Sequence, residues 1–158
     1  MNIFIEEHIQ LLKDMLSEGI QFILVGGYAV NFHGYNRTTG DLDVWLKPDE
    51  DTKTKVLLLF KKYGFDKESI GHIRRLDFTQ TLVFSIGDQP FKTDFLTQVS
   101  GVTYEEADIG KDFFDLEGFK IPFISFNHLI LTKISTGRGK DKVDIEMLQD
   151  VKKYNKKG

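Results

Sequence analysis

The sequence predicts an α+β fold, in which a mixed β-sheet carries helices packed mainly on one side. Short apolar runs typical of strands are separated by amphipathic runs with helical spacing, and the two kinds do not alternate strictly along the chain. Strict alternation would instead indicate a doubly wound parallel sheet. A length of 158 residues corresponds to one domain. We assign residues 1–151 to that domain and residues 152–158 to a basic C-terminal tail.

Helices are expected where apolar residues recur every three or four positions and where capping residues mark the ends. Gly19 and Gly64 each follow such a run, acidic residues after Pro48 open one, and Ser125 is a good N-cap for another. The expected helices span, in chain order, residues 5–18, 28–33, 48–63, 103–109, 126–135 and 141–154.

Strands are expected where apolar residues form short buried runs or alternate with polar ones. Gly26 and Gly27 break the first such run, and Asp41 opens the second. The expected strands cover residues 21–25, 41–46, 92–96 and 119–124, with a hairpin over residues 72–85 and loops over residues 34–40 and 137–140.

Composition excludes several classes of protein. With 41% hydrophobic and 28% charged residues, the chain does not belong to the disordered class. A formal net charge of −3 argues against a duplex nucleic-acid binder that works by bulk basic charge. The absence of cysteine excludes a disulfide scaffold, a thiolate zinc site and a cysteine nucleophile. The acidic N-terminus does not resemble an export signal, and the longest apolar run is far shorter than the about 20 residues of a membrane span. We therefore expect a cytoplasmic protein with no membrane partner.

Two glycines follow the first predicted strand. Gly26 and Gly27 would let a ligand approach the backbone closely, and a helix that starts there would offer free N–H groups suited to phosphate. A tight strand-to-helix turn explains the same glycines without any ligand. Taken alone, the pair does not decide between these interpretations.

Carboxylates follow on the next predicted strand. The alternation of a strand places Asp41 and Asp43 on one face, about 7 Å apart. Aspartate is depleted in strands, so the pair indicates cation binding, although a solvent-facing edge would also accept it. Asp94 would join the pair if its strand is a neighbour, but sequence alone does not select it over Asp77 or Asp88. Oxygen ligands without histidine or cysteine favour Mg²⁺ or Mn²⁺.

The two features together resemble a known signature. Gly26-Gly27, a gap of thirteen residues and then Asp41-Leu42-Asp43 is similar to the motif of the DNA polymerase β-like nucleotidyltransferase superfamily. A small bacterial branch, which includes AbiEii-like toxins and uncharacterised nucleotidyltransferases, shows further similarity in an arginine-threonine segment before the aspartates and in a C-terminal helix pair. The resemblance covers about residues 20–150 through roughly ten motif residues.

The resemblance implies a two-metal site for phosphoryl transfer. Asp41 and Asp43 would hold two Mg²⁺ ions, with Mn²⁺ as the alternative, and Asp94 would complete the site and serve as the candidate general base. The backbone of Gly26 and Gly27 would contact the triphosphate. An acceptor hydroxyl would attack the α-phosphate of a nucleoside triphosphate (NTP), so that a nucleoside monophosphate is transferred and pyrophosphate is released.

Basic residues in the similar segments are candidates for binding the nucleotide. We assign this role to Arg37, Lys133, Arg138 and Lys140. Each has a plainer alternative. Lys133 would also suit a solvated helix face, and Arg37 a solvated loop. Arg138 and Lys140 would suit a connector between two helices that carries surface charge. Asp141 is expected to cap the last helix with Asp144 at its third position, and His33 is expected to be partly buried and hydrogen-bonded.

The leading hypothesis is an Mg²⁺-dependent nucleotidyltransferase. Its acceptor would be RNA such as a tRNA end, a protein hydroxyl, or a small molecule such as an antibiotic. The alternative is a catalytically inactive module of the same fold that regulates another protein or belongs to a toxin–antitoxin pair, and the plainest interpretation is an α+β domain with structural glycines and aspartates. No second domain is large enough to hold a substrate, so we expect a small acceptor or a site shared in a homodimer. A cognate toxin or antitoxin is the other protein partner considered.

Overall fold

The computed structural model describes residues 4–36 and 40–157. Its strands are β1 (Phe22–Val25), β2 (Leu42–Leu46), β3 (Val83–Ile86), β4 (Thr93–Leu96), β5 (Asp112–Leu116) and β6 (Phe119–Phe123). Its helices are α1 (Glu6–Ser17), α2 (Gly26–Phe32), α3 (Glu50–Lys62), α4 (Lys67–Arg74), α5 (Tyr104–Gly110), α6 (Phe126–Thr136) and α7 (Gly139–Lys157). Within these residues the strands form one mixed six-stranded sheet in the order β3-β4-β2-β1-β6-β5. The predicted α+β class and mixed sheet are confirmed.

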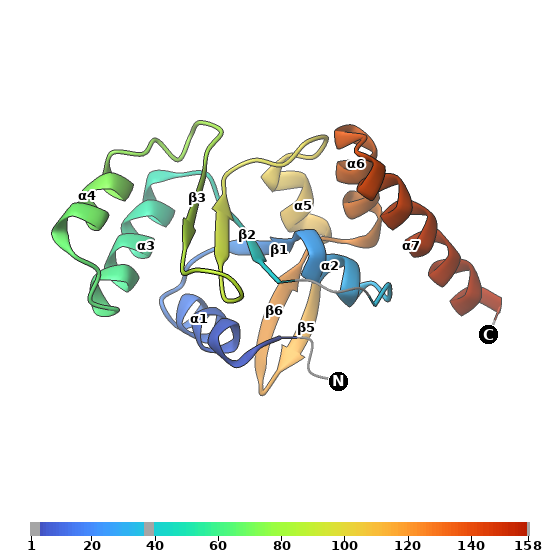
Figure 1. Ribbon diagram of the computed structural model, residues 1–158, viewed down its shortest axis with the longest axis horizontal. Coiled ribbons are helices and arrows are strands. Elements are labelled where there is room, and N and C mark those ends of the chain that lie inside the picture. The colour runs from blue at the N-terminus through green and yellow to red at the C-terminus, as the bar shows by residue number, and fades with distance from the viewer. Residues whose placement is uncertain (1–3, 37–39, 158) are drawn as a thin grey trace.

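The sheet lies in the middle of the molecule (Figure 1). Helices α3 and α4 flank its β3 end, whereas α6 and α7 lie beyond the opposite side and α7 runs outward to the C-terminus. Among the helices of the described residues, none is long and apolar enough to span a lipid bilayer.

The hairpin expected over residues 72–85 is wrong. Residues 67–74 form α4 instead, because Asp66 caps the helix by accepting a hydrogen bond from the Ser69 backbone N–H, and Ile70 and Ile73 are buried three positions apart. A hairpin does form later in the chain, between β3 and β4. The sequence pattern also missed β5, whose residues are mostly exposed and therefore lack an apolar alternation.

The last helix is longer than expected at both ends. Helix α7 includes Gly139 and Lys140, which were expected in a loop, and it continues to Lys157 through most of the basic C-terminal tail. No proline interrupts the sequence between residues 139 and 157, so nothing in it stops the helix. Near its C-terminal end the half-buried Val151 packs against Gly34, which follows α2.

Strand register determines where the candidate site forms. Strand β2 pairs antiparallel with β1, which places Val25 opposite Asp43, and parallel with β4, which places Asp43 opposite Asp94. Strand β3 in turn places Ser85 opposite Asp94. The expectation that the Asp94 strand neighbours the Asp43 strand is therefore confirmed.

The core fixes the orientation of β2. Leu42, Val44 and Leu46 are fully buried, so the opposite face of the strand presents Asp43 and Trp45. Trp45 packs edge-on against Tyr104 of α5, with ring centroids 5.3 Å apart, and donates a hydrogen bond from Nε1 to the backbone oxygen of Thr97. This packing prevents β2 from slipping by one residue, since a slip would exchange Asp43 with a core residue.

Candidate active site

Asp43 lies in the middle of the sheet and is only partly accessible to solvent. Burial, together with the nearby charges of Asp94 and Asp41, raises the pKa of Asp43 from 3.8 to about 6. Lys140 and Lys133 act in the opposite direction but do not cancel the shift. A carboxylate in this position favours a neighbouring cation.

The hairpin between β3 and β4 holds the other two carboxylates. Gln89 donates a hydrogen bond to Oδ1 of Asp41 over 2.7 Å, and the Ser85 hydroxyl donates to Oδ1 of Asp94. Lys92 places Nζ 3.3 Å from Oδ1 of Asp94 and 4.0 Å from Oδ2 of Asp41. Within residues 4–36 and 40–157, no three histidine, cysteine or acidic side chains are grouped closely enough to hold a metal ion. Asp41 and Asp94 are thus bound to hairpin residues in this state.

Gly26 meets Asp43 at the end of β1. Its φ of +68° lies in the left-handed region, where glycine is favoured over other residues. A Cβ atom at this position would lie 2.0 Å from Oδ2 of Asp43. Glycine is therefore required here both for the strand-to-helix turn and for the close approach of the aspartate.

The substitution Gly26→Ala is expected to remove activity. It should also lower the melting temperature by more than the backbone strain of alanine at a positive φ would do alone. The control is Gly64→Ala, because Gly64 has a φ of +84° and a Cβ atom added there would meet nothing within 4 Å. Strain in this region costs about 1–2 kcal/mol in either variant, and only Gly26→Ala also displaces the Asp43 carboxylate. Thermal denaturation and a nucleotidyl transfer assay check both. Equal losses in the two variants would contradict the role of the Asp43 contact.

A cavity of about 400 Å³ opens beside Asp43. Strand β2 and the start of α2 form one wall, the junction between α6 and α7 forms the other, and the end of β4 with residues 98–100 completes the lining. The glycines and the charged residues of this lining are Gly26, Gly27, Asp43, Lys133, Arg138, Lys140 and Asp141. Asp41 and Asp94 are not part of its lining, so the cavity reaches the carboxylate cluster from the Asp43 side.

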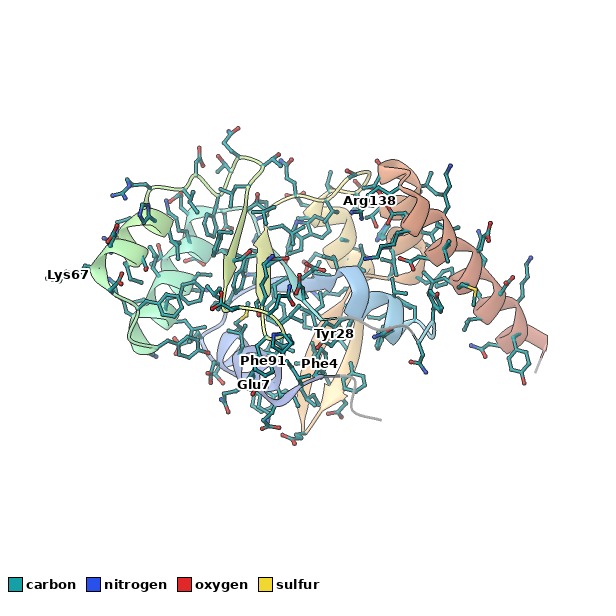
Figure 2. The ribbon with its side chains drawn as sticks, in the orientation of Figure 1. Phe4, Glu7, Tyr28, Lys67, Phe91 and Arg138 are labelled. Atoms are coloured by element: carbon teal, nitrogen blue, oxygen red, sulfur yellow. The ribbon has the colours of Figure 1, made fainter. Side chains whose placement is uncertain are left out.

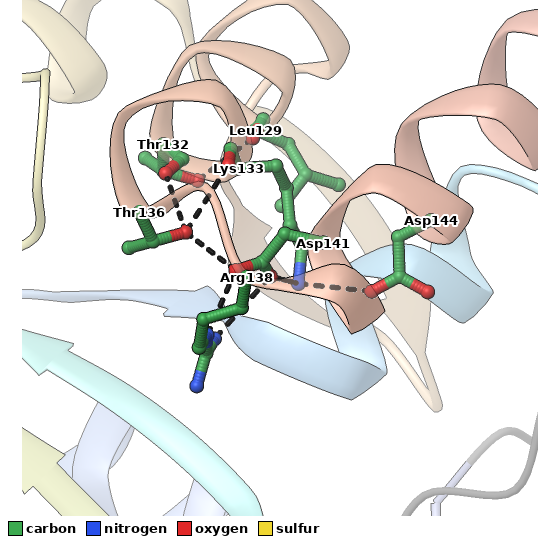
Figure 3. A network of polar contacts seen from close by, with 7 residues as sticks. All are labelled: Leu129, Thr132, Lys133, Thr136, Arg138, Asp141 and Asp144. Carbon is green, nitrogen blue, oxygen red and sulfur yellow. Dashed lines mark hydrogen bonds and ion pairs between the residues drawn. The ribbon is translucent and has the colours of Figure 1, made fainter.

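The α6–α7 junction forms the cationic wall, because it carries the basic residues Lys133, Arg138 and Lys140. Lys133 and Arg138 belong to an ionic network with two buried aspartates (Figure 3). Lys133 lies between two aspartates, with Nζ 3.2 Å from Oδ1 of Asp141 and 3.0 Å from Oδ2 of Asp144. Arg138 and Thr136 donate hydrogen bonds to Oδ2 of Asp141 over 2.8 and 2.6 Å. The side chain of Lys133 is 8% exposed, and those of Asp141 and Asp144 are 0% and 2% exposed.

One alternative and one expectation about this segment are wrong. The alternative that Lys133 is a solvated lysine on a helix face is excluded, because the pair of aspartates holds it inside the α6–α7 junction. Asp141 does not serve mainly as a cap: it lies within the first turn of α7 and accepts hydrogen bonds from three side chains. Burial alone would raise the pKa of Asp141, but the hydrogen bonds from Arg138, Thr136 and Lys133 hold it well below the usual value.

Comparison with known proteins identifies the family of the chain. The model of a family described as nucleotidyl transferases of unknown function (DUF2204) matches residues 5–158. The chain belongs to this nucleotidyltransferase family. No curated protein matches it in sequence.

Solved structures share the nucleotidyltransferase fold. The Thermotoga maritima protein TM1012, described as a nucleotidyltransferase, has a TM-score of 0.59 at 13% identity, with 98% of this chain and 97% of that chain covered. The lincosamide antibiotic adenylyltransferase LnuA, solved with lincomycin bound, has a TM-score of 0.58 at 14% identity, with 96% and 99% covered. A nucleotidyltransferase-like protein from Paracoccidioides brasiliensis has a TM-score of 0.51 at 15% identity, with 90% and 74% covered. Identities this low indicate a shared fold alone.

Other residues singled out in the sequence have definite places in this nucleotidyltransferase. His33 is partly buried and donates a hydrogen bond from Nε2 to the backbone oxygen of Ile124 over 2.7 Å, as expected. Asp77 accepts hydrogen bonds from Thr79 in the turn before β3, away from Asp43. Arg37 lies outside the described residues.

Sequence reasoning missed the hairpin residues that hold Asp41 and Asp94. Lys92 could have been found, because it precedes Asp94 by two positions on an expected strand and therefore shares its face. Ser85 could not, because the strand that carries it was assigned to the wrong hairpin. Gln89 lies in a loop and gives no periodic signal.

Proposed function

We propose that this nucleotidyltransferase moves a nucleoside monophosphate from an NTP to an acceptor hydroxyl in an Mg²⁺-dependent reaction. The observation that supports this most strongly is the pairing of opposite charges across one cavity. Asp43 lines one wall, with the charges of Asp94 and Asp41 behind it, and the basic α6–α7 junction lies on the other. A triphosphate that carries a divalent cation matches both walls.

The carboxylates fit Mg²⁺ by their chemistry. Asp43 and Asp94 are register neighbours, Asp41 lies one residue before β2, and Asp43 has a raised pKa that a cation would relieve. All three offer hard oxygen ligands, and we propose them as the residues that hold the metal. When bound, Mg²⁺ would neutralise charge on the triphosphate and increase the acidity of the acceptor hydroxyl.

The remaining residues would bind and orient the nucleotide. The backbone of Gly26 and Gly27 would lie against the phosphates, because neither residue has a side chain that fills the cavity. Lys140 lines the cavity and its charge reaches Asp43, so it is placed to bind phosphate oxygens beside the carboxylates. The guanidinium of Arg138 donates to Asp141 from Nε and Nη2, and because the side chain is 67% exposed its Nη1 would be placed to donate to the same phosphates. Lys133 would contribute its charge from within the network.

The reaction replaces one oxygen–phosphorus bond with another. The acceptor oxygen forms a bond to the α-phosphorus, the bond between the α-phosphorus and the bridging oxygen breaks, and pyrophosphate leaves. Asp94 is our candidate to take the hydroxyl proton, since it lies beside Asp43 on the sheet. Positioning and charge neutralisation carry most of such a reaction, so few side chains suffice.

A small acceptor fits the cavity better than a macromolecule. Its volume of about 400 Å³ is at the lower end of small-molecule sites, which run from about 300 to 1,000 Å³. The structure of LnuA, which shares the fold, contains the antibiotic lincomycin. A net charge of −3 gives no general attraction for RNA. We therefore propose a small hydroxylated molecule as the acceptor.

A thermal-shift panel tests the nucleotide site. ATP, GTP, CTP and UTP are each added with Mg²⁺ or with EDTA. A ligand at 100 times its dissociation constant adds about 2.7 kcal/mol, which corresponds to roughly 5–10 °C for a domain of this size. We expect such a shift for at least one NTP, and only with Mg²⁺. Asp77→Asn serves as the control and should shift like the wild type, whereas no shift with any NTP would contradict the proposal.

A further inference from the structure

We propose that Lys92 is a built-in counter-ion that competes with the divalent cation for the carboxylates of Asp41 and Asp94. The proposal rests on the function proposed above, because the competition requires a site that takes a metal. Lys92 would then set the metal affinity of the enzyme without being a metal ligand.

The position of Lys92 follows from β4. It stands immediately before the strand and two residues before Asp94, so both side chains leave the sheet on one face. Its ammonium lies 3.3 Å from Oδ1 of Asp94 and 4.0 Å from Oδ2 of Asp41. All three side chains are partly shielded, with exposures of 35% for Lys92, 30% for Asp41 and 18% for Asp94. The ammonium therefore bridges the two carboxylates in a place where water screens it only in part.

A hydrogen bond from α1 holds the hairpin loop that carries Lys92. His8 of α1 is buried, donates from Nε2 to the backbone oxygen of Phe91 over 3.3 Å, and accepts from the Tyr28 hydroxyl at Nδ1 over 3.1 Å. Figure 2 labels Phe91 and Tyr28, the two residues that His8 contacts. Burial lowers the pKa of His8, which agrees with the neutral ring that these two bonds require. The hydrogen bond to Phe91 holds the backbone beside Lys92, and the long side chain of Lys92 extends from it to the two carboxylates.

The hairpin also engages other oxygens of the same carboxylates. Gln89 donates to Oδ1 of Asp41, and Ser85 donates to Oδ1 of Asp94. Together with Lys92 these contacts turn Asp41 and Asp94 toward the hairpin, and the three aspartates do not converge as a metal cage in the described chain.

Electrostatics makes the two cations exclusive. Like charges that share the same oxygens repel strongly where water screens them only in part. An ammonium between Asp41 and Asp94 would repel a divalent cation that used the same oxygens, so the lysine side chain must move away when the metal enters. Lys92 therefore stabilises the carboxylates of Asp41 and Asp94 in the metal-free protein and lowers the affinity of the site for the metal.

Manganese titration of Lys92→Met tests this competition. Mn²⁺ binding is measured by electron paramagnetic resonance or calorimetry without nucleotide, and the melting temperature is recorded with and without metal. We expect Lys92→Met to bind Mn²⁺ at least about ten-fold more tightly than wild type, since removing one repulsion of about 1.4 kcal/mol suffices. Its melting temperature without metal should fall, and the difference should shrink in saturating Mn²⁺. Lys92→Arg, which keeps the charge, should behave like the wild type.

Lys47→Met is the matched control. Lys47 directly follows β2 and forms a similar partly exposed ion pair with Asp49 over 3.7 Å, away from Asp94. Its loss should leave Mn²⁺ affinity unchanged. If Lys92→Met does not fold, Lys92→Gln provides the same neutral test with a side chain that still donates a hydrogen bond.

Two results would contradict different proposals, one the role of Lys92 and the other the proposed function. Equal or weaker Mn²⁺ binding by Lys92→Met, with an intact Mg²⁺-dependent NTP shift, would overturn only the role of Lys92. No Mn²⁺ binding by either protein, together with no NTP shift, would overturn the proposed function and the competition with it.

Discussion

Replacing Asp43 with asparagine is expected to abolish nucleotidyl transfer and to stabilise the metal-free protein at the same time. Asparagine has nearly the same shape but no charge, so the contacts with Gly26 and β4 are retained. Loss of a carboxylate at the point where charge develops should lower the rate by at least about 10²–10³-fold. The stability gain has a separate cause, which is the removal of a buried negative charge next to two others.

The sign of this gain follows from the pKa. Asp43 titrates at about 6 in the folded protein against 3.8 without the fold, so the folded state binds its proton more tightly. Its contribution to stability is therefore most favourable below pH 4 and declines as the pH rises through about 6. At pH 8 the decline amounts to about 3 kcal/mol, which corresponds to several degrees in melting temperature.

Melting curves between pH 4 and pH 8 check the prediction. The difference between Asp43→Asn and wild type should be near zero at the acid end, grow through about pH 6 and stay constant above it. Saturating Mg²⁺ with NTP should reverse the order, because only the wild type gains from the ligand. Asp77→Asn, in a surface turn, should show no gain at pH 8. A variant that is less stable than wild type at pH 8 in EDTA would contradict the electrostatic explanation.

Local pattern was enough to find the carboxylates but not their arrangement. Two local features are visible in the sequence. The spacing of Asp41 and Asp43 matches the two-residue period of a strand, and the glycine pair marks the turn that ends the strand before them. The parallel pairing that places Asp94 opposite Asp43 joins segments about fifty residues apart, and no local propensity encodes it.

The partners of charged residues are even harder to predict from local sequence. Lys133 has the sequence surroundings of a solvated helix residue, and its burial depends on Asp141 and Asp144 from the next helix. The role of Lys92 likewise depends on Asp41, which lies one residue before β2 and far from Lys92 in the sequence. Sequence reasoning identifies residue types that suit a reaction, whereas the pairing of charges is decided by tertiary packing.

Replacing Lys133 with methionine is expected to cause a large loss of stability. Methionine retains the length and apolar stem of lysine but leaves Asp141 and Asp144, which are 0% and 2% exposed, short of one cation. Removing one member of a buried ionic group costs about 3–5 kcal/mol. Urea denaturation measures this, with Lys142→Met on the exposed face of α7 as the control. A loss no greater than that of the control would show that the network contributes little to stability.

The double variant Lys133→Met, Asp144→Asn separates stability from nucleotide binding. Neutralising Asp144 lowers the negative charge left in the junction, so part of the lost stability should return. The cavity would still lack the Lys133 charge, and nucleotide affinity should therefore stay reduced. Recovery of stability without recovery of the NTP thermal shift would assign Lys133 a direct part in binding phosphate. Recovery of both would instead mean that Lys133 serves to hold α6 and α7 together, and that Arg138 and Lys140 alone bind the triphosphate from the cationic wall.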